Sequence, residues 1–141
     1  MVAMNFFNPF FAAVMNGEHN LSTGSVKIAL SNVAPDPTWS SLTSVTQIAA
    51  INGYVAGGQA LDNVTSTQTA GVYALKADDE VFTAAGGSMA TFRYAVLYND
   101  SHASDGLIGW WDYGSAIDLS VGETCTIDFI ARVVFTFTID T

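Results

Sequence analysis

The sequence predicts an all-β domain, an antiparallel β-sandwich or jelly roll with one short helix near its N-terminus. From Ser25 onward, apolar residues alternate with polar ones over short segments, which is the period of a half-buried strand. Glycine pairs and Asn or Asp clusters separate these segments as turns do. Long stretches of helical periodicity are missing, which argues against a parallel sheet wrapped by helices and favours a sandwich or jelly roll.

The length of 141 residues fits one domain. Within it we expect an N-terminal arm and short helix over residues 1–17 and a β-sandwich domain over residues 18–141. Asn8 can cap the helix, and Pro9 suits its first position because the missing N–H has no partner there. Apolar residues then recur at helical spacing, and Gly17 supplies the stop.

The next segments combine strands with turns. Val26, Ile28 and Leu30 alternate with less apolar residues and predict the first long strand. A loop over Asn32–Pro37 follows, with one helical turn carrying Trp39 and Leu42. The glycine-rich segment Ile51–Gly58 predicts turns that lead into another strand. The remaining predicted strands are Gln59–Ser66, Val72–Ala77, Glu80–Ala84, Thr91–Asn99, Leu107–Tyr113, Thr124–Ile130 and Arg132–Asp140.

Three details of these strands can be tested. Asp78-Asp79 predicts a turn into the strand that follows. Alternation over Thr91–Asn99 predicts that Phe92, Tyr94, Val96 and Tyr98 share one face. The segment from Phe129 to Phe135 lacks the Gly or Asn break expected between two strands. A long bent strand or a bulge is therefore expected there in place of a hairpin.

The composition points to association. Only 12% of the residues are charged and 50% are hydrophobic, whereas about a quarter are charged in an ordinary soluble domain. Burial against neighbours and a neutral Ser/Thr-rich surface are the two explanations, and the first favours a homodimer or homotrimer. The net charge of −9 and the pI near 4.1 argue against nucleic acid and anionic membranes as partners. Apolar runs such as Phe10–Met15 are far shorter than a membrane-spanning helix.

Aromatic residues supply the candidate interface. Four phenylalanines within six positions near the N-terminus need a hydrophobic receptor, either the core of the chain itself or a neighbouring subunit. Two adjacent tryptophans in a strand must point to opposite faces, so at most one can lie on an outer face. The candidate interface residues are Phe6, Phe7, Phe10, Phe11, Trp110 and Trp111.

Residues for chemistry are sparse, so we expect no enzyme, no catalytic or metal-binding residues and no cofactor. His19 and His102 lie far apart in the sequence without metal-ligand companions, and we expect both to be exposed. The loop Asn99–Asp105 lacks the length and terminal Glu of an EF-hand. The single cysteine, Cys125, excludes an intrachain disulfide and is expected to be a small core residue. The first residues lack the positive region of a secretory signal, so synthesis in a cytoplasm is expected.

Several short motifs together resemble a known kind of protein. They are Asn16-Gly-Glu18, Val26-Lys-Ile-Ala-Leu30, Gly53-Tyr-x-x-Gly-Gly58-x-x-Leu61, Arg93-Tyr-Ala-Val-Leu-Tyr-Asn-Asp100, Leu107-Ile-Gly-Trp-x-Asp-Tyr-Gly114 and a closing C-terminal strand. Their order resembles small virion structural proteins of tailed bacteriophages, of the type that decorates or cements capsids, over roughly residues 10–139. In such proteins the motifs are structural and transfer no active site.

The resemblance implies a place and a partner. It implies a protein made in the host cytoplasm that binds the major capsid protein on the outer surface of the virion capsid. The acidic composition suits a surface away from packaged DNA. A carbohydrate- or receptor-binding module of a head or tail fibre is the alternative, because an exposed tryptophan on a β-sandwich can stack on sugars.

Overall fold

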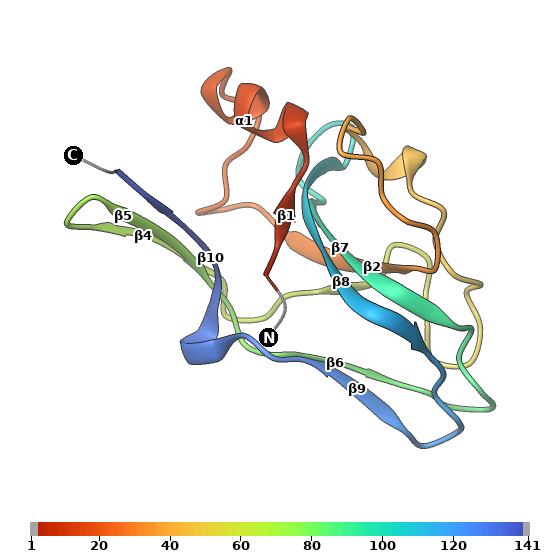
Figure 1. Cartoon of the computed structure of the whole chain (residues 1–141). Helices are drawn as coiled ribbons and strands as arrows, with labels where there is room; N and C mark the ends of the chain where they lie inside the picture. The colour runs from red at the N-terminus through yellow and green to blue at the C-terminus, as the bar shows by residue number, and fades with distance from the viewer. Residues whose placement is uncertain (1–2, 140–141) are drawn as a thin grey trace.

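The computed structural model describes residues 3–139 as two β-layers with one short helix between them at one end (Figure 1). The predicted fold class, an all-β sandwich with a short N-terminal helix, is confirmed. Met1 and Val2 of the expected arm, and Asp140 and Thr141 at the end of the expected sandwich domain, lie outside the described residues.

The first layer is a five-stranded antiparallel sheet. Its strand order is β1-β8-β7-β2-β3, and the long central pairs are β7 with β8 and β2 with β7. In this order the strands are β1 (Asn5–Phe6), β8 (Gly106–Ile117), β7 (Phe92–Asn99), β2 (Val26–Ser31) and β3 (Gln59–Ala60).

The second layer consists of a three-stranded sheet, β10-β5-β4, and a two-stranded sheet, β6-β9. Because β5 leads into β6 and β9 leads into β10, the two sheets form one bent ribbon (Figure 1). The strands are β4 (Thr65–Thr69), β5 (Val72–Lys76), β6 (Glu80–Thr83), β9 (Thr124–Ile127) and β10 (Val133–Thr138).

The bend in this ribbon has a local cause. A 3-10 turn, η2 (Ile130–Arg132), separates β9 from β10, and Ala131 and Arg132 adopt φ angles of 54° and 63° there. The expected bent path in place of a hairpin is therefore present. The expected turn at Asp78-Asp79 does not reverse the chain, since β5 and β6 pair with β10 and β9 and not with each other.

The helix α1 (Asn8–Met15) forms where it was predicted, with Pro9 in its first turn and Gly17 at a φ of 77° after its end. Its cap differs from the expectation. Phe7 is the extended N-cap residue, no side chain caps the helix, and Asn8 is its first helical residue. The helical turn predicted to carry Trp39 and Leu42 is displaced, because Trp39 is not helical and the 3-10 helix η1 (Leu42–Ser44) begins only at Leu42.

The five-stranded sheet is buried on both faces, which fits the mostly buried patterns of β2 and β7. The larger cluster of buried side chains lies between the layers, where Leu30 and Ile108 meet Phe82 and other residues of the ribbon. The smaller cluster lies on the opposite face and contains Val96 and Leu107. Sequence alternation alone therefore cannot separate an inner face from a solvent face in this sheet.

The row predicted on β7 is divided between the two faces of the sheet. Phe92 belongs to the cluster between the layers, whereas Val96 and Tyr98 belong to the cluster on the other face. The prediction that Phe92 shares one face with them is therefore wrong. The pairing of β7 with β8 is irregular between Phe92 and Tyr94, which interrupts the strict alternation on which the prediction depends.

Candidate interaction surfaces

The aromatic residues of the N-terminal segment meet the C-terminal strand of the same chain. The ring centroid of Phe6 lies 5.4 Å from that of Phe135 and 5.2 Å from that of Phe137. These distances are typical of favourable aromatic pairs. The core of the chain itself therefore supplies a receptor for these rings. The aromatic cluster comprises Phe6, Phe10, Phe11, Tyr73, Phe135 and Phe137.

Burial divides the four candidate phenylalanines into two pairs. Phe7 and Phe10 are 0% and 2% exposed, so they offer no surface to a neighbouring subunit. The expectation that these two rings face a neighbour is wrong, because each fills a position in the core of its own chain. Phe11 is 45% exposed and Phe6 is half-buried, so a role of these two rings in an interface stays a prediction.

The two tryptophans point to opposite faces of β8, as their adjacency predicts. Trp110 packs against Phe7, with ring centroids 4.6 Å apart, on the outer side of the five-stranded sheet. Trp111 is 6% exposed and packs between the layers against Phe129. The indole N–H of Trp111 has no hydrogen-bond partner within the described residues. Trp111 is therefore almost fully buried in the core and offers little surface to a partner, and Phe7 packs against Trp110.

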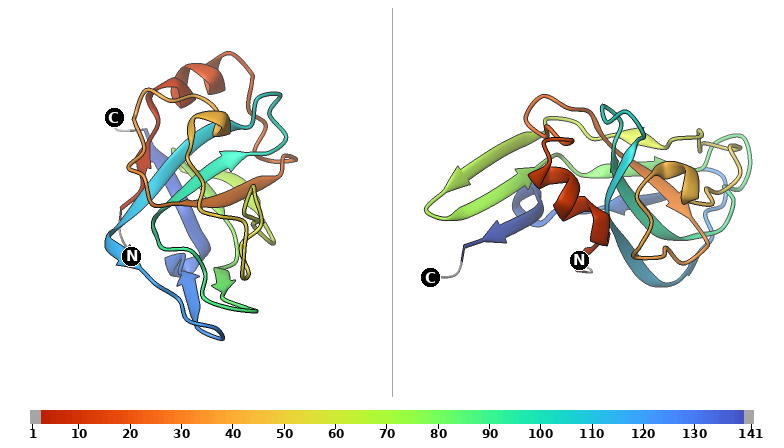
Figure 2. Two further views of the ribbon diagram at one scale, coloured as in Figure 1. Left: turned by 90° about the vertical axis from the view of Figure 1, so that its right-hand side faces the viewer. Right: turned by 90° about the horizontal axis from the view of Figure 1, so that it is seen from above.

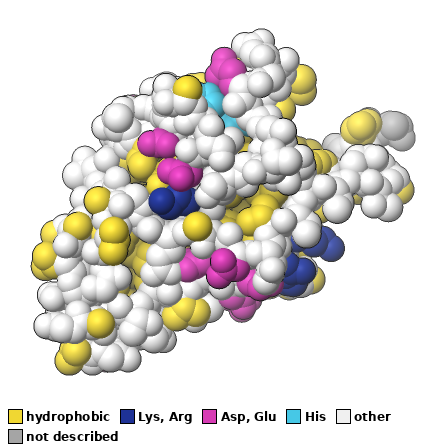
Figure 3. Space-filling model, turned by 180° about the vertical axis from the view of Figure 1, so that it is seen from behind, with side chains coloured by type: hydrophobic (Ala, Val, Ile, Leu, Met, Phe, Trp, Pro, Cys, Tyr) yellow, Lys and Arg dark blue, Asp and Glu magenta, His cyan; other side chains and the backbone are white. Residues whose placement is uncertain are grey.

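The sheet β10-β5-β4 projects from the body of the molecule, and we call it the tongue (Figure 1). Each of its outer strands, β10 and β4, is hydrogen-bonded to β5 alone among the described strands. Neither strand contains a charged residue. In the view from behind, no charged side chain is seen on the described end of the tongue, which is mostly white with some hydrophobic atoms, and the nearest Lys and Arg side chains lie at its base (Figure 3).

The outer face of the tongue is rich in threonine. Val72 and Ala74 of β5 occupy the middle of this face and are partly buried. Strand register places exposed threonines on both sides of them. These threonines are Thr65, Thr67 and Thr69 on β4 and Thr136 and Thr138 on β10. Of the two surface explanations that the composition left open, this face matches the neutral Ser/Thr-rich one.

A groove separates α1 from the inner face of the tongue. Seen from above, α1 lies between the tongue and the five-stranded sheet (Figure 2). The cavity has a volume of about 520 Å³. Its lining includes Phe10, Val14, Leu21, Tyr73 and Phe137. Four members of the aromatic cluster, Phe10, Tyr73, Phe135 and Phe137, therefore line a groove that is open to solvent.

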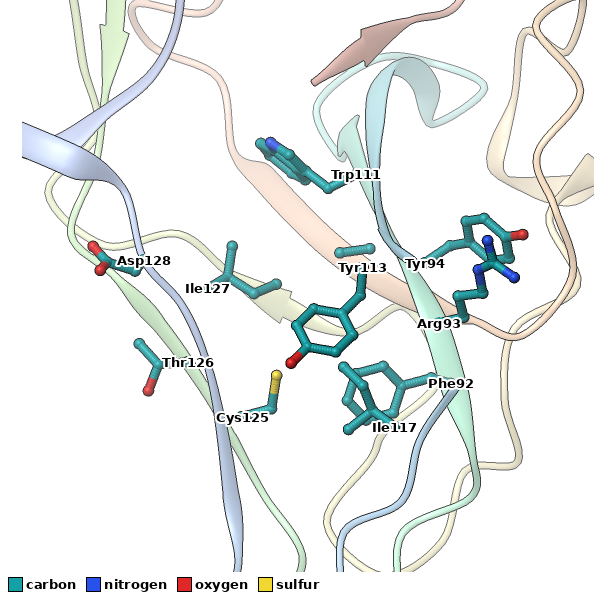
Figure 4. A pocket seen from close by; sticks show the side chains of 11 residues that line it. Phe92, Arg93, Tyr94, Trp111, Tyr113, Ile117, Cys125, Thr126, Ile127 and Asp128 are labelled. Carbon is teal, nitrogen blue, oxygen red and sulfur yellow. The ribbon is translucent and has the colours of Figure 1, made fainter. Parts of the chain in front are cut away.

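A second opening, of about 460 Å³, lies at the other end of the sandwich between β8 and β9. Tyr113 of β8 and Cys125 of β9 lie on its facing sides (Figure 4). Cys125 is half-buried at the border of the core, as its small apolar character predicts, and burial raises the pKa of its thiol. The charged residue Arg93 lies at the rim, where it donates two hydrogen bonds to the carboxylate of Asp112.

The two histidines form a stacked pair, with ring centroids 4.9 Å apart. The expectation of two separate exposed histidines is wrong, because the loop after α1 brings His19 onto the β7–β8 loop that carries His102. Oδ1 of Asn99 accepts a hydrogen bond from the backbone N–H of Ser101. This orients the amide NH₂ of Asn99 toward His19, and the distance from Asn99 Nδ2 to His19 Nδ1 is 3.1 Å. His102 Nε2 lies 3.3 Å from the Glu18 carboxylate.

This pair predicts a dependence of stability on pH. Burial, followed by the charge of His102, lowers the pKa of His19 from 6.5. Below about pH 6.5 the unfolded chain therefore binds a proton that the folded chain binds less readily. We expect the free energy of unfolding to fall as the pH falls from about 7 to about 5, before most carboxylates titrate.

Urea unfolding at a series of pH values measures this effect, and the variant H19Q should flatten the dependence. H102Q is the matched control. H102Q removes the electrostatic repulsion between His102 and a protonated His19 but leaves His19 buried. It should therefore reduce the dependence of stability on pH only in part. A wild-type stability that is constant over this pH range would contradict the prediction.

The described residues contain no group of three or more His, Cys, Asp or Glu side chains placed to hold a metal ion. Within residues 3–139, no helix combines the length and the apolar character needed to cross a membrane. No protein-family model, curated protein or solved structure matches this chain.

Proposed function

We propose that this protein is a structural component of a bacteriophage virion that decorates or cements the capsid lattice through apolar and backbone contacts. The observation that carries the proposal is the tongue, whose two outer strands are uncharged and pair with no described strand other than β5, on a chain in which only 12% of the residues are charged. Open, uncharged edges favour pairing with another chain. The proposed partners are the major capsid protein and further copies of this chain.

Two further observations support a mechanical role. The glycine motif that resembles virion proteins serves packing, since Gly57 donates its N–H to Gln47 and accepts a hydrogen bond from the Tyr98 hydroxyl. The same Gln47 oxygen accepts a hydrogen bond from Tyr54. The net charge of −9 suits the proposed place on the outer capsid surface, where no nucleic acid is bound.

The copy number of the protein in purified particles tests the proposal. A lattice-binding protein should be present at a stoichiometry near that of the major capsid protein, as measured by gel densitometry or an electron-microscopy map. Particles that lack it should assemble but break at a lower temperature or after osmotic shock. A few copies per particle would contradict the proposal.

The second candidate is a carbohydrate- or receptor-binding module of a head or tail fibre. The opening between β8 and β9 favours it, because Tyr113 is 63% exposed at the rim of an apolar cavity and could stack on a sugar ring. Particles that lack the protein would then be as robust as the wild type but would fail to adsorb to cells. Binding of the isolated domain to a glycan array, together with loss of this binding in the Y113A variant, would also support the carbohydrate-binding function.

A further inference from the structure

We propose that two copies of this chain pair through the free edges of their β10 strands, in antiparallel orientation about a two-fold axis. The pairing would join the two tongues into one continuous six-stranded sheet. This inference deepens the self-association within the proposed function by naming its surface. It does not depend on the capsid assignment, because the dimer would form in solution.

The edge of β10 lacks charge and proline, two of the features that normally prevent pairing. Exposed edges of natural sheets are protected by charged side chains, by proline or by coverage with another element. The sequence of β10, VVFTFT, has neither charge nor proline, and no other described strand bonds to its outer side. The bulge opposite β5 lies between Val133 and Phe135, so the strand is regular from Phe135 to Thr138.

Apolar surface beside this edge distinguishes it from the edge of β4. The exposed side chains of β4 are threonines and a glutamine, which water solvates well. Beside β10, the Phe11 ring lies 5.4 Å from Phe137 while 45% of Phe11 stays exposed. Ile139, directly after β10, is 73% exposed. Of the two open edges, β10 therefore has more to gain from burial.

The symmetry of the pairing favours a second copy as the occupant. A two-fold axis perpendicular to the sheet keeps equivalent faces of the two tongues on the same side. The Phe11 and Phe137 rings of both copies would then line one side of the seam, and the threonines would line the other. The paired segments carry no charge, so no like charges would face each other. Such an isologous contact also closes, whereas pairing of β10 with β4 of another copy would polymerise.

Two matched variants test the inference. Thr136 and Thr67 are exposed threonines that flank Ala74 at the same register and on the same face, one on each edge of the tongue. T136K places like charges at the proposed seam, whereas T67K places the same charge on the other edge. Sedimentation equilibrium of both variants and the wild type at micromolar concentration gives the oligomeric state. Circular dichroism and thermal melting establish that each variant is folded.

We expect the wild type and the T67K variant to be dimers. In T136K, we expect the dissociation constant of the dimer to be higher by about tenfold or more. Amide hydrogen exchange should also show protection of Phe135–Thr138 that increases with protein concentration, with no such increase in Thr65–Thr69. A monomeric or trimeric wild type, an unchanged dimer in T136K, or equal dissociation of both variants would overturn the inference. Failure of T136K to fold would leave the exchange experiment on the wild type to decide.

Discussion

Replacing Phe7 with alanine should lower the free energy of unfolding by about 3–5 kcal/mol, which is the usual effect of emptying an aromatic core position. The Phe7 side chain is fully buried and packs against Trp110, and its backbone N–H donates to the carbonyl oxygen of Ile108 at 3.1 Å. The substitution leaves the backbone bond in place, so the loss measures the ring alone. Urea unfolding monitored by tryptophan fluorescence measures this difference.

Phe11 provides the matched control, since it lies four residues further on and is 45% exposed. F11A should lower the free energy of unfolding of the monomer far less, by about 1 kcal/mol or below, because much of the Phe11 side chain is already exposed to water. Equal losses in F7A and F11A would contradict the arrangement of the N-terminal segment. The comparison also separates folding from assembly, because F11A alters the apolar surface beside β10 without emptying the core.

Burial of Phe7 and Phe10 also changes what a truncation should do. A free arm could be removed without loss of the fold. Here, deletion of residues 1–8 would remove β1 from the edge of β8 and the Phe7 ring from the core. We therefore expect the truncated chain to be strongly destabilised. A truncated chain with wild-type stability would show that the segment is an independent arm.

Local patterns predicted most elements of this fold, because the helix and the longer strands follow side-chain periodicity and turn residues. They missed the short strand β1, and the single strand predicted over Gln59–Ser66 is two strands, β3 and β4, which belong to different sheets. Pairing was not predictable in the same way. The path from β5 to β6 contains two aspartates that favour a turn, yet Asp79 accepts a hydrogen bond from the backbone N–H of Phe129, in the segment that follows β9. Its role depends on a residue fifty positions away, to which no local pattern refers.

The candidate surfaces differ from the sequence-based expectation for the same reason. Clustering of phenylalanines near the N-terminus correctly indicated a need for a hydrophobic receptor, but the receptor is formed by Phe135 and Phe137 at the other end of the chain. The stacking of His19 on His102 likewise requires two loops to meet. The burial of a single side chain and the contact between two loops depend on how distant segments pack together. Local patterns in the sequence do not contain this information.

The largest effect of a single substitution is expected at Gly58, where two requirements for glycine coincide. Its φ of 73° is unfavourable for a residue with a side chain. A Cβ at this position would also overlap the carbonyl group of Ile28 and lie 2.9 Å from the Cα of Ala29. Both contacts are to the backbone of β2, which cannot move without disturbing its pairs with β3 and β7.

Gly114 is the matched control because its φ of 96° is also positive, while nothing lies within 4 Å of the Cβ that alanine would add. G114A should therefore cost only the backbone strain, about 1–2 kcal/mol. G58A adds the clash with β2, and we expect a loss above about 4 kcal/mol or the absence of a cooperative transition in urea. Equal losses in the two variants would mean that the Gly57-Gly58 turn does not approach β2 as closely as described. A much larger loss in G58A would show that this glycine is required for packing of the turn against the sheet.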